Sequence, residues 1–211
     1  MHTDYFDISK TDYKGLFDEI QHIWELIDRI TPYIQSRLTS DLKPNISEIE
    51  LPPSVNYESP DIYIGQNVKI EPDVFIKGPA IIDDGAFIGH GAFIRDYALI
   101  GKGAVVGHAT EVKHSVFLEK AGAPHFSYIG DSVLGQRVNL GAGAKLSNFP
   151  VKFMNRDPLP TIKLLIDDEP FDTGLSKFGA ILGDDVQIGC NAVTNPGTVI
   201  GARSWVYPLV S

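Results

Sequence analysis

A histidine and two cations are the residues of this sequence with the clearest chemical potential. His125 falls within residues 124–128, which interrupt an otherwise regular pattern and which we expect to form an extruded loop. Histidine is the usual general base near neutral pH, so this position suggests proton transfer, with a surface histidine in a turn as the alternative. Arg95 and Lys113 are eighteen residues apart. Together they could clamp an anion, because arginine offers a planar fork to phosphate.

Other polar residues nearby could assist or compete with this group. Tyr128 and Asn139 could donate hydrogen bonds to a phosphate or to sugar hydroxyls. His90 and His108 are also eighteen residues apart, which raises the possibility of a metal site, with His114 six residues further on. The spacing and the acidic companions of the carbonic anhydrases that use a similar scaffold are missing, so we expect no metal.

The composition sets the class of protein that must position these residues. The chain has 211 residues, 43% of them hydrophobic, with one Cys and a net charge of −9. One cysteine excludes an internal disulfide and a cysteine-based zinc cluster. The acidic balance argues against a nucleic-acid partner. Without a membrane-length apolar run or a secretory leader, a cytoplasmic protein is expected.

A six-residue repeat organises most of the chain. Branched aliphatic residues recur at every sixth position, at Ile64, Ile70, Ile76, Ile82, Ile88, Ile94, Ile100, Val106, Val112 and Leu118. The pattern resumes at Leu134, Leu140 and Leu146, and again at Leu182, Ile188, Thr194, Ile200 and Val206. A second series of small or β-branched residues runs in step with the first.

Six residues fit a short strand followed by a turn, and three such units close a triangular coil. The aliphatic side chain points inward, the small residue lies at the tight corner, and glycine allows close backbone approach. This pattern predicts an all-β protein, a single-stranded parallel β-helix of hexapeptide repeats in which each coil pairs with its neighbours. Arg95 and Lys113 would then lie on one face of adjacent coils.

Three segments lie outside the repeat. Residues 14–40 have the apolar spacing of an amphipathic helix, which Pro32 would kink or end. We expect this helix to pack on the end of the β-helix or against the same helix of a second subunit. The alternative is that it binds another protein. Residues 41–61 contain four prolines and predict an extended linker. Residues 149–178 predict an excursion loop, with strands at 151–154 and 161–166.

Three runs carry a resemblance to a known family. They are residues 107–113, residues 120–131, which include the Pro-His-Phe-Ser-Tyr sequence at 124–128, and residues 139–143. They resemble the acetyltransferase half of the glucosamine-1-phosphate acetyltransferase/N-acetylglucosamine-1-phosphate uridyltransferase proteins. They are still more similar to the archaeal-type sugar-1-phosphate nucleotidylyltransferases, which share segments like 172–174 and 177–180. The resemblance covers roughly residues 64–211 and implies a left-handed coil, a homotrimer and acyl transfer from acetyl-coenzyme A.

The resemblance also assigns roles to individual residues. It places the general base at His125. It places the sugar-phosphate contacts at Arg95, Lys113, Tyr128, Asn139 and Asn148. It places the acetyl-coenzyme A contacts at Ala142, Lys177, Cys190 and Pro208. Cys190 and Pro208 depart from the family pattern, and the basic residue that binds the coenzyme phosphate has no counterpart.

The sequence therefore predicts an N-terminal helix and linker over residues 1–61 and an acyltransferase β-helix over 62–211. The expected reaction moves an acetyl group from acetyl-coenzyme A to the amine of a sugar phosphate resembling glucosamine 1-phosphate, without the nucleotidylyltransferase half and without a metal. Two alternatives stay open. One is an O- or N-acyltransferase acting on a nucleotide-linked sugar. The other is a non-catalytic β-helix that binds a sugar nucleotide or a partner protein.

Overall fold

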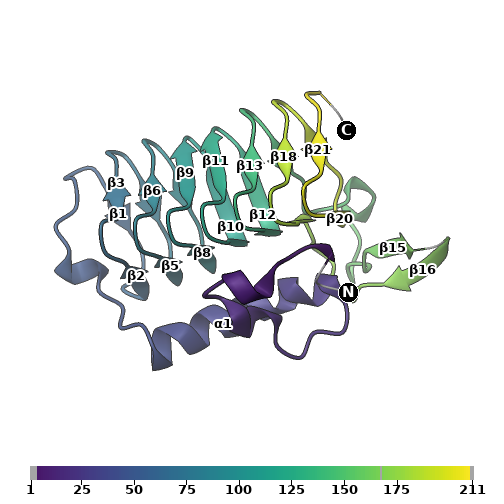
Figure 1. The fold of residues 1–211 in the computed structure, drawn as a ribbon, viewed down its shortest axis with the longest axis horizontal. Coiled ribbons are helices and arrows are strands. Elements are labelled where there is room, and N and C mark those ends of the chain that lie inside the picture. Colours follow the sequence, from purple (N-terminus) through teal and green to yellow (C-terminus); the bar gives the residue numbers. More distant parts are fainter. Residues whose placement is uncertain (1–3, 167, 210–211) are drawn as a thin grey trace.

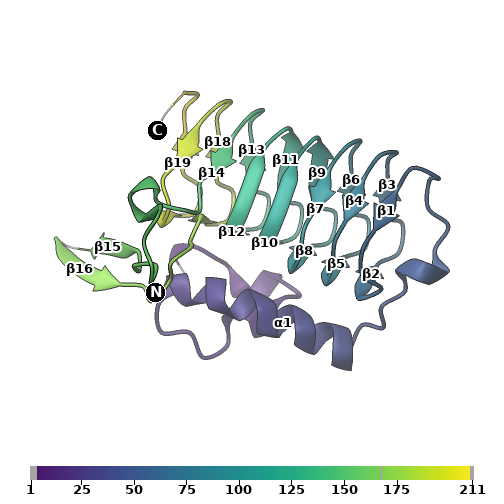
Figure 2. The ribbon, with the colours of Figure 1, turned by 180° about the vertical axis from the view of Figure 1, so that it is seen from behind.

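The six-residue pattern folds into a stack of triangular coils. The computed structural model describes residues 4–166 and 168–209. Short strands lie in three rows, one on each face of the stack, and they pair in parallel with the strand one coil away. The coils follow one another along the long axis of the molecule, from blue to yellow in Figures 1 and 2. The predicted parallel β-helix is therefore confirmed.

The first face contains β1 (Asn56–Tyr57), β4 (Phe75–Ile76), β7 (Phe93–Ile94), the first half of β10 (Glu111–Phe117), the first half of β12 (Tyr128–Leu134), β14 (Lys145–Leu146) and β19 (Val193–Thr194). The second face contains β2 (Ile62–Ile64), β5 (Ala80–Ile82), β8 (Ala98–Ile100), the second halves of β10 and β12, β17 (Ala180–Leu182) and β20 (Thr198–Ile200). The third face contains β3 (Lys69–Ile70), β6 (Phe87–Ile88), β9 (Val105–His108), β11 (Gly122–His125), β13 (Asn139–Leu140), β18 (Gln187–Ile188) and β21 (Trp205–Val206).

The inside of the stack is filled by the aliphatic residues of the repeat. Ile88, Ile94 and Ile100 are fully buried, and each pairs with its counterpart on the adjacent coil. One position of the coil leaves no room for a side chain: a Cβ at Gly107 would overlap the backbone carbonyl of Pro124. Glycine is therefore required there by close backbone approach.

Two coils are one residue shorter than the repeat predicts. Ile100 pairs with Phe117, and Phe117 pairs with Leu134, so two steps along the chain, from Val112 and from Ile129, have five residues. The expected inward position at Leu118 is wrong. Phe117 belongs to the cluster inside the coils, whereas Leu118 packs in the second cluster outside them.

The predicted extruded loop at residues 124–128 is wrong. The step from Ala123 to Ile129 has the regular six residues, so nothing is extruded. Strand β11 extends to His125 and β12 begins at Tyr128, which leaves only two residues between them. His125 pairs with His108 of the preceding coil.

Serine hydroxyls compensate for the residue lost at each shortened corner. Regular corners between the first and second faces have two turn residues and then an alanine or threonine, such as Ala98 or Thr198, whereas the shortened ones have one turn residue and then Ser115 or Ser132. The Ser115 hydroxyl donates to the Lys113 carbonyl, and the Ser132 hydroxyl donates to the Gly130 carbonyl. The single turn residues, His114 and Asp131, adopt left-handed backbone angles of 44° and 46°.

The N-terminal helix is shorter than predicted. Helix α1 spans Leu26–Ser40 and continues through Pro32, whereas Lys14–Phe17 and Ile23–Glu25 are separate 3₁₀ turns. Glu19 breaks the helical pattern with a left-handed φ of 61°. The apolar residues before position 26 are therefore placed by packing on the coils and not by helical periodicity.

The N-terminal segment and α1 cover the second face of the stack. Figures 1 and 2 both show α1 running alongside the coils. The outward residues of the covered strands, such as Ile81, Leu99 and Val116, are buried against Leu16, Ile30 and other residues of this segment. Strands of this face are therefore apolar on both sides, as expected for doubly covered strands.

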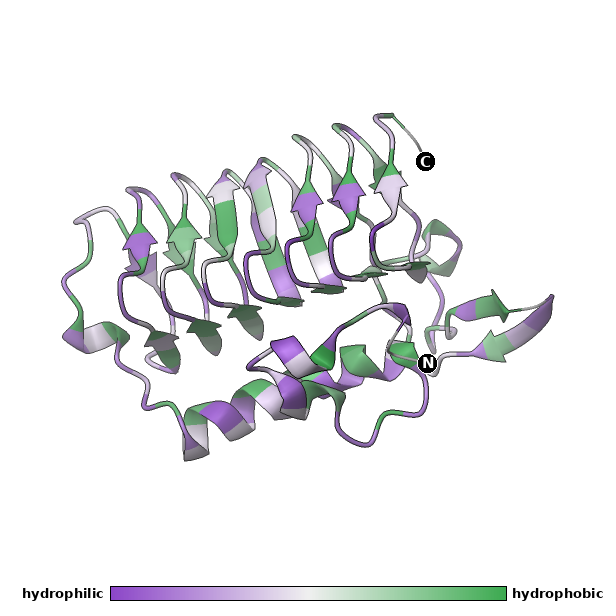
Figure 3. Ribbon diagram, viewed as in Figure 1, coloured by the Kyte–Doolittle hydropathy of each residue, from purple (hydrophilic) through white to green (hydrophobic). Residues whose placement is uncertain are grey.

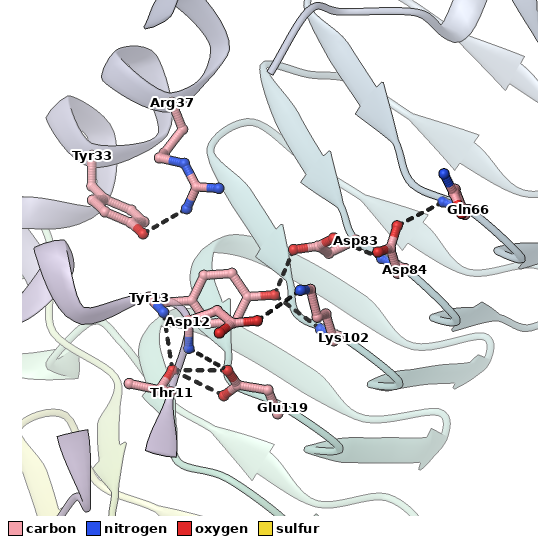
Figure 4. Close-up of polar contacts among 10 residues, drawn as sticks. All are labelled: Thr11, Asp12, Tyr13, Tyr33, Arg37, Gln66, Asp83, Asp84, Lys102 and Glu119. Carbon is pink, nitrogen blue, oxygen red and sulfur yellow. Dashed lines mark hydrogen bonds and ion pairs between the residues drawn. The ribbon is translucent and has the colours of Figure 1, made fainter. Parts of the chain in front are cut away.

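Polar contacts fix the N-terminal segment to the corners of the coils (Figure 4). The buried Tyr13 hydroxyl donates to Asp83 and accepts a hydrogen bond from the backbone N–H of Lys102. Burial and the neighbouring Asp83 carboxylate raise the pKa of Tyr13. Thr11 and the Asp12 backbone both bond to Glu119.

The two remaining segments differ in part from the sequence expectations. Within the predicted linker, β1 pairs with β4 and Ile46–Glu48 forms a 3₁₀ turn. Residues 151–154 were expected to be a strand, but Val151–Phe153 forms a 3₁₀ turn.

Strands β15 (Lys163–Ile166) and β16 (Glu169–Asp172) form an antiparallel hairpin beside the coils. Hydrophobic residues colour much of this hairpin green in Figure 3, and Leu165 is largely exposed. Across the described residues, no helix combines the length and hydrophobicity that a membrane span requires.

Candidate functional site

A cationic cavity lies on the outside of the shortened coils. It has a volume of about 440 Å³. Its lining residues come from three adjacent coils and from the segment that follows β14: Arg95, Lys113, Tyr128, Asn148, Phe149, Leu159 and Lys177. Five of the residues singled out in the sequence therefore meet in one place.

The repeat itself places the first two cations. Ile94 pairs with Val112, so Arg95 and Lys113 leave adjacent coils at equivalent positions. Arg95 forms an ion pair with Glu111 at 2.9 Å, and the hydrogen bond that Arg95 donates to that carboxylate is the main cause that raises the pKa of Arg95. Lys113 lies 3.8 Å from a carboxylate oxygen of Asp131.

The third cation of the cavity is Lys177. The resemblance assigns this residue to the coenzyme, and it lines the same cavity as Arg95 and Lys113. Among the described residues Lys177 takes part in no ion pair. Phe149 and Leu159 complete the cavity with apolar surface. The cavity therefore combines three cationic side chains, two of them also paired with carboxylates, with an apolar wall, which suits an anion attached to a larger organic group.

Tyr128 and Asn148 form the polar floor of the cavity. The Tyr128 hydroxyl donates to the side-chain oxygen of Asn148 at 3.3 Å. Burial is the main cause that raises the pKa of Tyr128, and the nearby Glu111 and Asp131 carboxylates add to it. The hydroxyl is therefore protonated at neutral pH.

Behind this floor lies Asp131, which the sequence analysis did not assign to the site. Its side chain is 8% exposed and accepts hydrogen bonds from His114, at 2.8 Å, and from the amide nitrogen of Asn148. Burial acts to raise the pKa of Asp131, but these bonds and the Lys113 charge outweigh it and lower the pKa. The available signal was the missing residue in two steps of the repeat, since His114 and Asp131 occupy both shortened corners.

His125 lies in a different row of residues. Successive coils bring one corner position into register, and backbone hydrogen bonds at this corner use the carbonyls of His90, His108, His125, Ala142 and Cys190 in turn. His125 is exposed and is not among the residues that line the cavity. It is joined to Tyr128, at the cavity, by only two residues.

The remaining predicted coenzyme contacts continue this corner row. Ala142, Cys190 and Pro208 follow His125 on three successive coils, and both Cys190 and Pro208 are exposed. None of these three carries a long side chain or a charge. At these three positions the row is therefore uncharged and lined by short side chains. Asn139 lies apart from the cavity, exposed on the third face.

The stacked histidines do not assemble a metal centre. The rings of His90 and His108 stack in parallel with centroids 5.7 Å apart, while His114 lies at another corner. Over residues 4–166 and 168–209, no group of three or more His, Cys, Asp or Glu residues is arranged to hold a metal ion.

Known proteins resemble this chain at the level of sequence. Its residues 76–204 match the family described as the GMPPB C-terminal domain. A bifunctional sugar-1-phosphate nucleotidylyltransferase/acetyltransferase of Sulfurisphaera tokodaii is 37% identical over 103 residues, which cover 49% of this chain and 24% of that protein. The bifunctional protein GlmU of Methanococcus aeolicus is 33% identical over 192 residues, 91% of this chain and 43% of that protein.

The chain spans less than half the length of either of these relatives. Among solved structures, PerB from Caulobacter crescentus, in complex with CoA and GDP-perosamine, aligns with 70% of this chain and 48% of its own at 16% identity and a TM-score of 0.32. The family match extends over more than half of the sequence and includes the coils that form the cationic cavity. The chain belongs to the GMPPB C-terminal domain family.

Proposed function

We propose that this protein transfers an acetyl group from acetyl-coenzyme A to the amine of an amino-sugar phosphate. The observation that carries the proposal is the cavity in which Arg95, Lys113 and Lys177 meet. In a chain with a net charge of −9, three cations around one cavity form a local site for an anion. The curated relatives whose names include sugar-1-phosphate and acetyltransferase activities support the same chemistry.

The cations would bind the phosphate and so position the sugar. Positioning alone supplies much of the rate of such a reaction, because two reactants are held as one complex. The apolar surface of Phe149 and Leu159 would pack against the sugar ring.

His125 would accept the proton from the amine. As the nitrogen attacks the thioester carbonyl, a carbon–nitrogen bond forms, the amine loses a proton to the imidazole, and the carbon–sulfur bond then breaks. The coenzyme thiolate leaves and takes up a proton. The N–H of Ala142 would stabilise the oxyanion, since none of the backbone hydrogen bonds among the described residues uses it.

Coenzyme A would lie along the corner row of Ala142, Cys190 and Pro208. When bound it supplies the activated acetyl group. The row fits the uncharged pantetheine arm, and its position next to His125 brings the thioester towards the proposed base. We also propose the left-handed coil, the homotrimer and the roles of Asn139 and Asn148 at the sugar, which rest on the family resemblance. We propose the cytoplasmic location from the composition, and the division into residues 1–61 and 62–211 from the extent of the repeat.

The test is coenzyme release from acetyl-coenzyme A with glucosamine 1-phosphate, followed chromatographically because Cys190 would react with thiol reagents. We expect His125→Ala to lower kcat by 10²- to 10⁴-fold, the usual contribution of a general base. His90→Ala is the matched control, because His90 is exposed in the same corner row two coils away and should leave turnover unchanged.

The acceptor panel includes other amino-sugar phosphates and nucleotide-linked amino sugars. If turnover occurs only with nucleotide-linked acceptors, the substrate is a nucleotide-linked amino sugar and not the proposed amino-sugar phosphate. Binding without turnover across the whole panel, with His125→Ala indistinguishable from wild type, would establish a non-catalytic binding protein and reject the proposal.

A further inference from the structure

The buried carboxylate of Asp131 holds three side chains at once. One of its oxygens accepts from the Nδ1–H of His114 at 2.8 Å, and the other faces the amide of Asn148 and the ammonium of Lys113. Asp131 itself does not line the cavity, whereas Asn148 and Lys113 do. Its effect on a ligand would therefore pass through these two neighbours.

The charge of Asp131 dictates the direction of a hydrogen-bond chain. An ionised carboxylate has only acceptor sites, so Asn148 must turn its NH₂ group towards Asp131. The amide oxygen of Asn148 then faces Tyr128 and accepts the phenol hydrogen. Because a hydroxyl has a single hydrogen, the hydrogen of Tyr128 is used inside the protein, and the oxygen presents its remaining lone pair outward.

The glycine beside this chain has no room for a larger residue. A Cβ on Gly130 would lie 2.6 Å from the Tyr128 hydroxyl oxygen and 2.8 Å from the Asn148 amide nitrogen. The space above Gly130 is therefore occupied by the Tyr128–Asn148 pair. This close packing holds the two polar groups in place independently of the charge on Asp131.

We infer that Asp131 is a positioning residue that fixes the chain Tyr128→Asn148→Asp131 and thereby makes the Tyr128 hydroxyl a hydrogen-bond acceptor towards the cavity. The sequence had suggested the opposite, a tyrosine that donates to the ligand. The inference rests on the proposed function only in taking the cavity as the substrate site.

This direction narrows the class of ligand. Arg95, Lys113 and Lys177 select an anion, and the Tyr128 oxygen selects an N–H or O–H group on the same molecule. A phosphate ester that carries an amine or hydroxyl satisfies both requirements, whereas a simple phosphate satisfies only the first. A site whose polar group would be left without a partner discriminates against the simpler ligand.

The test compares two probes in binding titrations without coenzyme: methyl phosphate, which has no carbon-bound hydroxyl or amine, and glucosamine 1-phosphate. Wild type should prefer glucosamine 1-phosphate. Tyr128→Phe should weaken the binding of glucosamine 1-phosphate by roughly five- to tenfold, because one hydrogen bond is lost. It should leave the affinity for methyl phosphate within about twofold of the wild-type value.

Asp131→Asn gives the more specific result. An asparagine can bond to His114 through its oxygen and donate its NH₂ to Asn148, so the whole chain can reverse and Tyr128 can donate to the ligand. We expect this variant to lose the preference for glucosamine 1-phosphate while methyl phosphate binds as well as before or better. Asp184→Asn is the matched control, because Asp184 is another buried carboxylate, bonded to Asp7 and Gln136 away from the cavity.

If Asp131 has only a structural role, Asp131→Asn should weaken the binding of both probes equally. That result would overturn the inference. Loss of methyl phosphate binding in Tyr128→Phe would also overturn it, because Tyr128 would then be a donor to the phosphate. So would a wild type that binds both probes equally or binds neither. A protein that shows the expected preference but no acetyl transfer would retain this inference and reject the proposed function.

Discussion

The regular coils and the shortened coils of this protein use the same repeat for different purposes. Where each step has six residues, as from Ile64 to Val106, two-residue turns join the strands, and corner residues such as Asp83 and Lys102 hold the N-terminal segment. Where the step falls to five residues, as from Val112 to Phe117, one turn residue remains and a hydroxyl takes over a backbone hydrogen bond. The loss of one residue brings His114, Asp131 and their neighbours together behind the cavity.

The comparison indicates that a coil shortened by one residue can bring together the side chains of a binding site. A longer loop would have been the obvious place to look for function, since loops often carry it. Here the residues that bind Asp131 come from adjacent rungs of a rigid stack. Both single turn residues have left-handed backbone angles, as do turn residues of regular corners such as Asn67 and Tyr97. Such angles cost free energy in non-glycine residues and are found where surrounding contacts enforce them.

The largest effect is expected at the inward residue of the first shortened step. Phe117 is fully buried between Ile100 and Leu134 of the neighbouring coils. Phe117→Ala should lower the free energy of unfolding by about 3–5 kcal/mol, as for other buried phenylalanines. Denaturant unfolding of the two proteins measures this difference in the free energy of unfolding. A difference near zero would show that Phe117 does not fill the core at this step.

The next effect concerns the serines that replace the lost residue. The buried Ser132 hydroxyl donates to the Gly130 carbonyl and accepts from the Ala180 N–H. Ser132→Ala leaves two buried backbone groups without a partner and should cost about 1–3 kcal/mol of unfolding free energy. The reciprocal change, Ala98→Ser in a regular corner, should give no stabilisation. A gain in stability there would contradict the comparison.

The shortened corners should also respond to pH. Because the pKa of Asp131 is lowered in the folded protein, its ionised form stabilises the fold at any pH above the unfolded pKa of about 3.9. That contribution is lost as the pH falls through the lower, folded value. Wild type should therefore lose stability more steeply below about pH 4 than Asp131→Asn. Parallel pH curves for the two proteins would contradict this assignment.

The smallest effects separate two kinds of glycine. Gly91, in a regular coil, has a left-handed φ of 68° and open space where a Cβ would lie, so Gly91→Ala should cost only about 1 kcal/mol through backbone strain. Gly130→Ala should instead displace Tyr128 and Asn148 and weaken glucosamine 1-phosphate binding. Unfolding and titration of both variants measure the difference. Equal effects on ligand affinity would show that Gly130 has no special place at the site.

The sequence predicts the regular coils well because their structure is local and periodic. Arg95 and Lys113 are placed together by the repeat alone, and the structure brings them to one cavity. The shortened steps were misread because Leu118 continues the aliphatic series by chance, and the shift in register shows only in the pairing of Phe117. The N-terminal helix was overextended for another reason: Leu16 and Trp24 are buried by contact with the coils, which no single-segment pattern contains.

The site was predicted in part for similar reasons. Tyr128 and Asn148 were identified by resemblance, but Asp131 becomes visible only when the coils are stacked and its carboxylate meets residues seventeen positions away on each side. The repeat could not predict that Lys177 lines this cavity, because residues 147–179 return to it by a path that has no repeat.

The central claim is that the cavity over the shortened coils is the site of the anionic substrate. A crystal structure of the protein with glucosamine 1-phosphate tests it most directly. We predict the phosphate between Arg95, Lys113 and Lys177, with an amine or hydroxyl of the sugar donating to the Tyr128 oxygen. A phosphate bound instead along the row of His90, His108 and His125, with the cavity left without ligand, would contradict the account.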